Sequence, residues 1–244
     1  MEIVKKVTKL IEYYKKGLLG GEIMPEDSKP KFLNSSEECY IYFTLPMALN
    51  YQRNSYKLWE NALKTYEDSQ TNFVFCPHKV VFCDDYELKK ALTTYKVALQ
   101  PNKQPIIWKT LCLTFVRDFG GSIKSFFEKF NYDIVLIKEY IQKHKRDFPY
   151  LSGTKILNYW LYVISEYTDA KLKNRNEISI APDTHVLQAS LKLGVISSDE
   201  FEKNNIREIA AARWKDILKG SGISPIDIHT PFWLWSRSGF RLEI

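Results

Sequence analysis

Apolar residues recur at intervals of three and four positions along most of the chain, which is the period of a helix with one buried face. In residues 1–17, lysines fall between Ile3, Val7, Leu10 and Ile11, so we predict a surface helix packed by one side. Further helices are predicted at 37–49, 55–66, 85–92, 106–119, 122–130, 134–144, 154–167, 185–193, 198–219 and 231–238. Strand-like alternation is scarce and is best at 72–82. The pattern therefore predicts an all-α fold with short connections.

Residues that interrupt helices separate these segments. Glycine and proline mark 18–38 as a loop, Gly120-Gly121 ends a helix, and a turn is predicted at 147–153. A charged connector at 169–177 precedes Pro182-Asp183, where another helix begins.

Composition limits the class of protein. A chain of 244 residues, 45% of them hydrophobic, can bury a full core as one domain of two lobes or as two small domains. The formal net charge of +6 permits a nucleic-acid partner without requiring one. Because no apolar run reaches the roughly 20 residues of a membrane span, we expect no membrane partner. We expect a cytoplasmic protein, associated with the nucleoid if its source is a prokaryote.

The four cysteines, Cys39, Cys76, Cys83 and Cys112, are expected to be reduced in that compartment. Cys76, His78 and Cys83 lie close enough in sequence to suggest zinc, but a fourth ligand is missing at any usual spacing and their neighbours are apolar. No cysteine follows Cys112, which argues against a C-terminal four-cysteine iron–sulfur cluster. We expect neither a metal nor another cofactor.

Two residues are candidates for chemistry. Asp183 immediately precedes a predicted helix, where an aspartate ordinarily accepts backbone N–H groups as the N-cap. Lys155 falls in the first turn of the helix 154–167, on one face with Tyr159 and Tyr162. A lysine there is ordinarily a solvated surface residue, although an amine in such a place can also serve as a nucleophile. Taken singly, each residue is explained by a structural role.

Taken together, the two residues lie in segments that resemble a known family. The segment FPYLSGTKIL at 148–157 resembles the hairpin of the helix-hairpin-helix DNA glycosylase superfamily, the endonuclease III-like and 8-oxoguanine DNA glycosylases. In that family a pattern close to Leu-Pro-Gly-Val-Gly-x-Lys-x-Ala contains the Schiff-base lysine of the bifunctional members. The segment DTHV at 183–186 is similar to the family's Val-Asp-Thr-His-Val. The lysine precedes the aspartate in both cases.

The resemblance covers about residues 41–239. Residues 45–55 are similar to the family's early helix, which ends in a glutamine that wedges into DNA, and Gln52 would be that glutamine. Residues 97–107 are similar to the family's segment in which a Gly-Leu turn and a lysine precede the next helix. Residues 225–235 are similar to the Pro-Ile-x-Leu-Asp-x-x-Leu-Trp pattern of some members.

The resemblance implies a two-lobed fold with the active-site cleft between the lobes, one formed by 41–165 and the other by 1–40 with 166–244. It implies a DNA repair enzyme that flips a damaged base out of the duplex and cleaves its N-glycosidic bond. Lys155 would attack the sugar, and Asp183 would stabilise the developing charge or activate the nucleophile. The covalent intermediate would also permit AP-lyase cleavage by β-elimination. If Lys155 is not the nucleophile, water would replace it.

The resemblance also implies which residues contact the substrate, double-stranded DNA with a damaged base, bound by a monomer. The expected DNA-binding residues are Gln52, Gly153, Thr154, Lys145, Arg146 and His185. The expected base-pocket residues are Tyr159, Trp233 and Phe240.

Two departures from the family pattern affect the substrate and leave alternatives open. The hairpin keeps one glycine, Gly153, where the family has two whose backbone N–H groups approach a phosphate. Asp183 follows Lys155 by 28 residues, and archaeal 8-oxoguanine glycosylases also have a long gap there. We therefore expect 8-oxoguanine first and oxidised pyrimidines second. The alternatives are an N-glycosidase for a free modified nucleoside or nucleotide, and a non-catalytic DNA-binding module.

Overall fold

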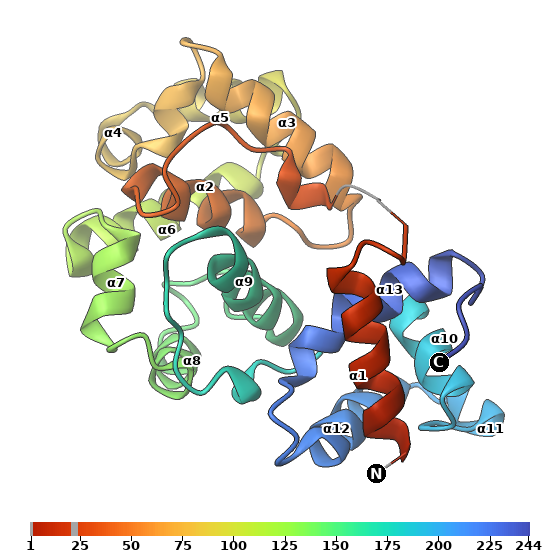
Figure 1. Cartoon of the computed structure of the whole chain (residues 1–244). Coiled ribbons are helices and arrows are strands. Elements are labelled where there is room, and N and C mark those ends of the chain that lie inside the picture. The colour runs from red at the N-terminus through yellow and green to blue at the C-terminus, as the bar shows by residue number, and fades with distance from the viewer. Residues whose placement is uncertain (1, 21–23) are drawn as a thin grey trace. The chain divides into compact units, whose positions relative to one another are not determined.

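A computed structural model describes residues 2–20 and 24–244, and all regular elements in these ranges are helices (Figure 1). An isolated bridge between Asp133 and Lys173 is the only strand-like pairing within the described ranges. The all-α prediction is therefore confirmed. Met1 lies outside the described residues, and so do residues 21–23, which belong to the predicted loop 18–38.

The chain forms two compact units. The central unit comprises residues 23–173, and the terminal unit comprises 1–22 with 174–244. The predicted lobe 41–165 lies inside the central unit, which also contains the residues that flank it. The N-terminal helix α1 (Glu2–Lys15) belongs with the C-terminal segments because it buries Val7 and Leu10 in their core.

The central unit is organised around helix α2. Its elements are η1 (Pro25–Asp27), α2 (Glu37–Ala48), α3 (Ser55–Glu67), η2 (Asn72–Phe75), α4 (Pro77–Phe82), α5 (Asp85–Thr94), α6 (Gln104–Phe119), α7 (Ile123–Lys129), α8 (Ile134–Lys143) and α9 (Thr154–Tyr167). Helix α2 runs through the middle, with α3, α6, α7 and α9 packed against it (Figure 1). It is apolar on all sides, as expected of a helix enclosed by others. Thr44 accepts a hydrogen bond from Nε1 of Trp160 in α9 at 2.9 Å, which anchors α9 to this core.

The segment with the best strand-like alternation, 72–82, is not a strand. Residues in this range form η2 and α4, which are joined at Cys76. Pro77 occupies the first position of α4, where its missing N–H costs nothing, whereas it could not donate to a strand ladder. The backbone carbonyl of Val74 accepts a hydrogen bond from Trp108 Nε1 at 2.9 Å, so this apolar segment packs as a helical turn on α6.

Capping residues set helix boundaries where the sequence predicted them. Asp84 caps α5 by accepting a hydrogen bond from the backbone N–H of Tyr86 at 2.8 Å. Gly120 ends α6 with a φ of 61°, in the left-handed region that favours glycine.

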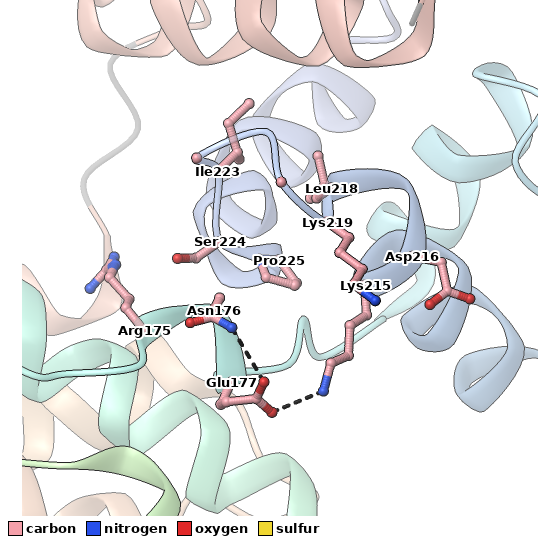
Figure 2. Close-up of a pocket in the computed structure, with 12 residues that line it drawn as sticks. Arg175, Asn176, Glu177, Lys215, Asp216, Leu218, Lys219, Ile223, Ser224 and Pro225 are labelled. Carbon is pink, nitrogen blue, oxygen red and sulfur yellow. Dashed lines mark hydrogen bonds and ion pairs between the residues drawn. The ribbon is translucent and has the colours of Figure 1, made fainter.

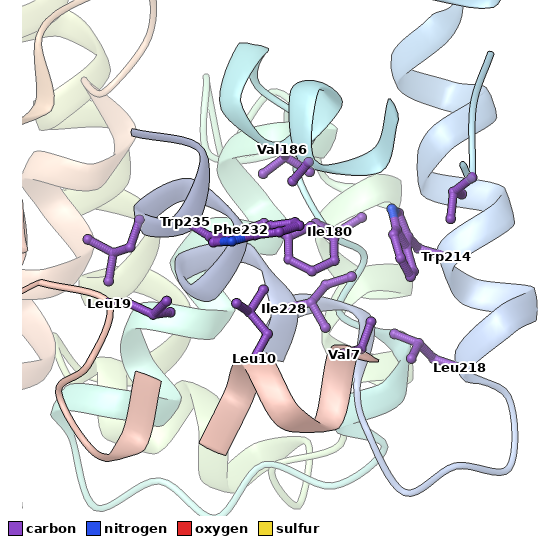
Figure 3. Close-up of a cluster of buried hydrophobic side chains, with 13 residues drawn as sticks. Val7, Leu10, Leu19, Ile180, Val186, Trp214, Leu218, Ile228, Phe232 and Trp235 are labelled. Carbon is purple, nitrogen blue, oxygen red and sulfur yellow. The ribbon is translucent and has the colours of Figure 1, made fainter. Parts of the chain in front are cut away.

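The terminal unit consists of short helices around one core. Its elements after α1 are η3 (Arg175–Glu177), α10 (Thr184–Lys192), α11 (Ser198–Phe201), α12 (Ile206–Leu218), η4 (Pro225–Ile228) and α13 (His229–Arg237). Figure 3 shows the buried side chains, with Phe232 of α13 between Leu10 of α1 and Trp214 of α12. Phe232 and Trp214 meet edge to face, their ring centroids 5.0 Å apart.

The prediction of a single helix at 198–219 is wrong, because this segment is divided into α11 and α12. Ser197 and Glu200 form a reciprocal capping box at the start of α11. Glu200 also pairs with Arg213 of α12 at 2.7 Å, which fixes the short helix against the longer one. The polar run 202–205 forms the connection between them.

Candidate nucleic-acid interface

Lys155 lies in the first turn of α9, where its side chain is exposed. The N-cap of α9 is Gly153, which has no side chain to accept the first N–H groups of the helix. Within the described part of the chain, the Lys155 amine has no ion-pair or hydrogen-bond partner. A primary amine thus stands beside backbone N–H groups and the positive end of the helix dipole.

The hairpin between α8 and α9 is held by its own backbone. Ser152 N donates to Phe148 O at 2.9 Å and Gly153 N donates to Tyr150 O at 3.0 Å. Gln142 of α8 donates a side-chain hydrogen bond to Ser152 O at 2.8 Å. A Cβ at Gly153 would come within 3.1 Å of Tyr150 O, which explains the glycine at this position. The hairpin is therefore a compact turn with a close backbone approach at Gly153.

Tyr150 has a φ of 62°, so its backbone adopts the left-handed conformation that favours glycine. A left-handed non-glycine residue costs about 1 kcal/mol or more, and such strain clusters at functional sites.

The loop that contains Gln52 lies against this hairpin. The rings of Tyr51 and Tyr150 have centroids 5.5 Å apart and are inclined by 47°. Gln52 is exposed and has a φ of 50°, so it is also a strained, left-handed residue. The structure thus brings together two segments, 45–55 and 148–157, that the sequence connects only through their resemblance to one family.

A third loop, between α5 and α6, completes this surface of the central unit. Arg53 donates to the backbone carbonyls of Val97 at 2.6 Å and of Lys96 at 3.1 Å. Lys103, which precedes α6, places its Nζ 5.1 Å from the centroid of the Tyr150 ring, within the range of a cation–π contact. The surface defined by loops 49–54, 96–103 and 144–153 is hereafter called the three-loop face.

Exposed cations belong to the loops of the three-loop face and to the helix ends next to them. The exposed basic side chains in these loops and at the adjoining helix ends are Lys96, Lys103, Lys143, Lys145, Arg146 and Lys155. Lys145 and Arg146 were predicted to contact phosphates, and both side chains are exposed to solvent in the loop 144–153. Thr154, another predicted DNA-binding residue, is exposed at the first position of α9. A polyanion would find cations and backbone N–H groups together on this face.

Tyr159, predicted to line a base pocket, instead belongs to a buried polar group. Its side chain hydrogen-bonds with Glu26, which also accepts a hydrogen bond from Trp59 Nε1 at 2.9 Å. Glu26 is only 1% exposed, and burial raises its pKa to about 7. Tyr159 therefore ties α9 to η1 and α3, one turn beyond Lys155.

Asp183 belongs to the terminal unit, whereas Lys155 belongs to the central unit. Asp183 caps α10, its Oδ1 accepting a hydrogen bond from Val186 N at 2.9 Å. Its side chain is half-buried, and Oδ2 has no hydrogen-bond donor among the described residues. The N-cap role is thus established, and it leaves one carboxylate oxygen available for other chemistry.

Helix α10, which Asp183 caps, packs on α13 and brings His185 into contact with residues of α13. His185 and Trp233 meet edge to face with centroids 5.9 Å apart, and His185 Nδ1 lies 3.2 Å from Ser236 Oγ. The guanidinium of Arg237 lies 4.5 Å from the centroid of the Trp233 ring. Trp233 is half-buried, so part of this aromatic and cationic cluster faces solvent.

Phe240, the third predicted base-pocket residue, packs on the core of the terminal unit. Its ring lies 4.7 Å from that of Trp235, whose Nε1 donates to Leu242 O at 2.8 Å. Phe240 therefore has a packing role, although its side chain, like that of Trp233, is only partly buried.

A cavity of about 620 Å³ lies beside residues 219–225 of the terminal unit (Figure 2). Its cationic lining is largely paired, because Lys215 contacts Glu177 at 2.9 Å and Arg175 contacts Asp227 at 2.8 Å. None of the residues predicted from the sequence lines it. The cavity is therefore not part of the candidate site.

The Cys76, His78 and Cys83 segment has no metal-site geometry. Among residues 2–20 and 24–244, no group of three or more His, Cys, Asp or Glu side chains is arranged to hold a metal ion. His78 instead places Nε2 3.0 Å from the Gly120 carbonyl. Within the same ranges, no helix has both the length and the apolar character needed to cross a membrane.

Comparisons of the chain with protein-family models, curated proteins and solved structures return no match. The residues that sequence reasoning missed are Tyr51 and Tyr150, which make the contact between two of the three loops. No local sequence pattern indicated either residue, because their contact depends on two loops that meet in space.

Proposed function

We propose that the protein is a DNA base-excision N-glycosylase with AP-lyase activity. The observation that supports this most strongly is the place of Lys155: an exposed amine at the uncapped start of α9, directly after a hairpin that the Gln52 loop contacts. Three segments of the resemblance, 45–55, 97–107 and 148–157, supply the three loops of one face. A chance likeness of short motifs gives no reason for them to converge.

On this proposal, DNA phosphates lie along the three-loop face. Backbone N–H groups of Gly153, Thr154 and Lys155 and the side chains of Lys145 and Arg146 are the candidate contacts. Gln52 projects from a strained loop and is suited to fill the space that a flipped nucleotide leaves.

The chemistry assigned to Lys155 is nucleophilic. Its unprotonated amine attacks C1′ of the damaged nucleotide, the N-glycosidic bond breaks, and the base leaves with the bonding electrons and takes up a proton. The sugar ring then opens to give an imine between Nζ and C1′. Loss of a C2′ proton expels the 3′-phosphate by β-elimination, and water hydrolyses the imine to release Lys155.

Asp183 is assigned the electrostatic role. A carboxylate with one oxygen held as an N-cap and the other available can stabilise positive charge on the sugar or accept the proton of the attacking amine. Trp233, with its partly open face beside His185 and Arg237, is the candidate for stacking on the extruded base. The proposed base is 8-oxoguanine in duplex DNA, excised by a monomer.

The test is borohydride trapping on a duplex that contains 8-oxoguanine. The native chain is expected to form a covalent adduct, and Lys155→Gln is expected to form none. Lys90 is an exposed lysine on α5, so Lys90→Gln is the matched control. This variant should form the covalent adduct to the same extent as the native chain. A Lys155→Gln variant that still traps would refute the assignment of the nucleophile.

Two other outcomes would select the alternatives. Base release without an adduct indicates that water is the nucleophile. Neither release nor adduct over a panel of oxidised purines and pyrimidines contradicts the proposal, and binding at low and high salt then separates the remaining functions. A DNA-binding module loses affinity steeply as salt rises, whereas an N-glycosidase for free nucleosides binds duplex DNA weakly at both concentrations.

A further inference from the structure

We infer that Tyr51, Tyr150 and Lys103 form a stacking platform for a nucleobase that is left unstacked when the duplex opens. This inference rests on the proposed function and goes beyond it, because none of the three residues is needed for cleavage of the N-glycosidic bond. It assigns a ligand of defined chemistry, a planar base on a phosphate backbone, to a part of the three-loop face.

The first support is the exposure of an aromatic side chain on a polar surface. Tyr51 is 52% exposed although its ring contacts that of Tyr150. Its hydroxyl has no hydrogen-bond partner among the described residues. An aromatic side chain that is about half exposed can stack on any nucleobase, because every base has a π-face.

The second support is that the platform is built rigidly. Arg53, next to Gln52, is fixed on the carbonyls of Lys96 and Val97, and burial lowers its pKa to about 10. The side chain of Gln104 accepts hydrogen bonds from Leu99 N at 2.6 Å and Gln100 N at 3.1 Å, which holds the turn before Lys103. Such loops lose little conformational freedom when a ligand binds.

The third support is backbone strain without a packing reason. Gln52, which follows Tyr51, and Tyr150, which takes part in the contact, both have positive φ. Neither side chain reaches a buried site, since Gln52 is exposed and Tyr150 is only partly buried. Strain of this kind persists where a function requires the conformation.

Charge defines the ligand. Lys103 lies over the Tyr150 ring, and Lys96, Lys145 and Arg146 are exposed in the same loops. Together these cations favour a phosphate backbone over an uncharged peptide or sugar. An opened DNA strand presents a phosphate and an unstacked base together.

The experiment measures fluorescence anisotropy of two duplexes, one intact and one with a tetrahydrofuran abasic analogue opposite 2-aminopurine. Tyr51→Ala is expected to weaken binding of the abasic duplex about tenfold and of the intact duplex less than twofold. Tyr51→Phe should bind both like the native chain. Tyr86→Ala, a tyrosine 75% exposed on α5, is the matched control and should change neither.

The emission of 2-aminopurine gives a second readout. Stacking on the platform quenches it, so Tyr51→Ala should restore part of the lost emission. Equal weakening for both duplexes, or none, overturns the platform. Borohydride trapping separates the two proposals: if the native chain traps and Tyr51→Ala binds the abasic duplex normally, only the platform is wrong. If the native chain neither traps nor releases a base, the proposed function is wrong.

Discussion

Trp59 donates its indole hydrogen to Oε1 of Glu26 at 2.9 Å, in a place where the glutamate is only 1% exposed. The side chain of Tyr159 on α9 hydrogen-bonds to the same carboxyl group. Glu26 thus joins η1, α3 and α9 through a polar group that water does not reach. Because no cation among the described residues pairs with it, burial raises its pKa from 4.5 to about 7.

The first prediction is that stability falls as pH rises through the range in which Glu26 ionises. The folded chain holds the Glu26 proton more tightly than the unfolded chain. The stability that the protonated Glu26 contributes is therefore complete below about pH 4.5 and is lost by about pH 7. The expected loss is roughly 3 kcal/mol in the free energy of unfolding. Urea unfolding of native and Glu26→Gln chains at pH 5 and pH 8 measures it.

Glu26→Gln removes the charge and should therefore remove this part of the pH dependence. Glu128→Gln, at an exposed position on α7, is the control and should keep the native profile. Parallel pH profiles for the native chain and Glu26→Gln would show that Glu26 is not the titrating group.

The second prediction compares two adjacent glycines at the end of α6. Gly120 and Gly121 have φ values of 61° and 80°, so alanine at either position costs about 1 kcal/mol in backbone strain. A Cβ at Gly121 would also run into the His78 ring, whereas one at Gly120 meets open space. Thermal unfolding should therefore show that Gly121→Ala is the less stable variant by roughly 1–2 kcal/mol. Equal stabilities would mean that the His78 side chain moves away freely.

The positions of most helices could be predicted because their boundaries are set by local chemistry. Asp84, Asp183 and Gly120 act within one turn of their own position, so a single sequence reveals them. The pattern at 72–82 did not identify its structure, because these apolar positions suit a strand as well as a packed helical turn. Contact with Trp108, which is distant in sequence, decided between them.

The candidate site was predictable only in part. Lys155, Thr154 and Gln52 were singled out in the sequence and are exposed as a binding role requires. The Tyr51–Tyr150 contact was not, because it depends on a positive φ at a tyrosine and on two loops meeting in space. The Tyr159 assignment ignored Glu26, whose position next to α9 no local pattern indicates.

The third prediction separates the two roles of Asp183. Asparagine can cap a helix as aspartate does, so Asp183→Asn should change the free energy of unfolding by less than about 0.5 kcal/mol, whereas Asp183→Ala should cost about 1 kcal/mol. Both variants are expected to lose base excision, because neither has a carboxylate. Asp84→Ala removes the comparable cap of α5 and should lose stability alone. If the loss of excision activity in the three variants paralleled their loss of stability, Asp183 would act only as a helix cap.

The last prediction concerns the strain at Gln52. Glycine adopts a φ of 50° without a steric penalty, so Gln52→Gly should raise the free energy of unfolding by about 0.5 kcal/mol after the entropy that glycine loses on folding is included. The same variant lacks the side chain proposed to enter the duplex, so its rate of 8-oxoguanine excision should fall. Stability and activity would then move in opposite directions, which is expected where a strained conformation serves function. Asn131→Gly, at a φ of 50° in the loop between α7 and α8, should leave excision unchanged. A Gln52→Gly chain that is both more stable and fully active would show that neither the strain nor the side chain contributes to the reaction.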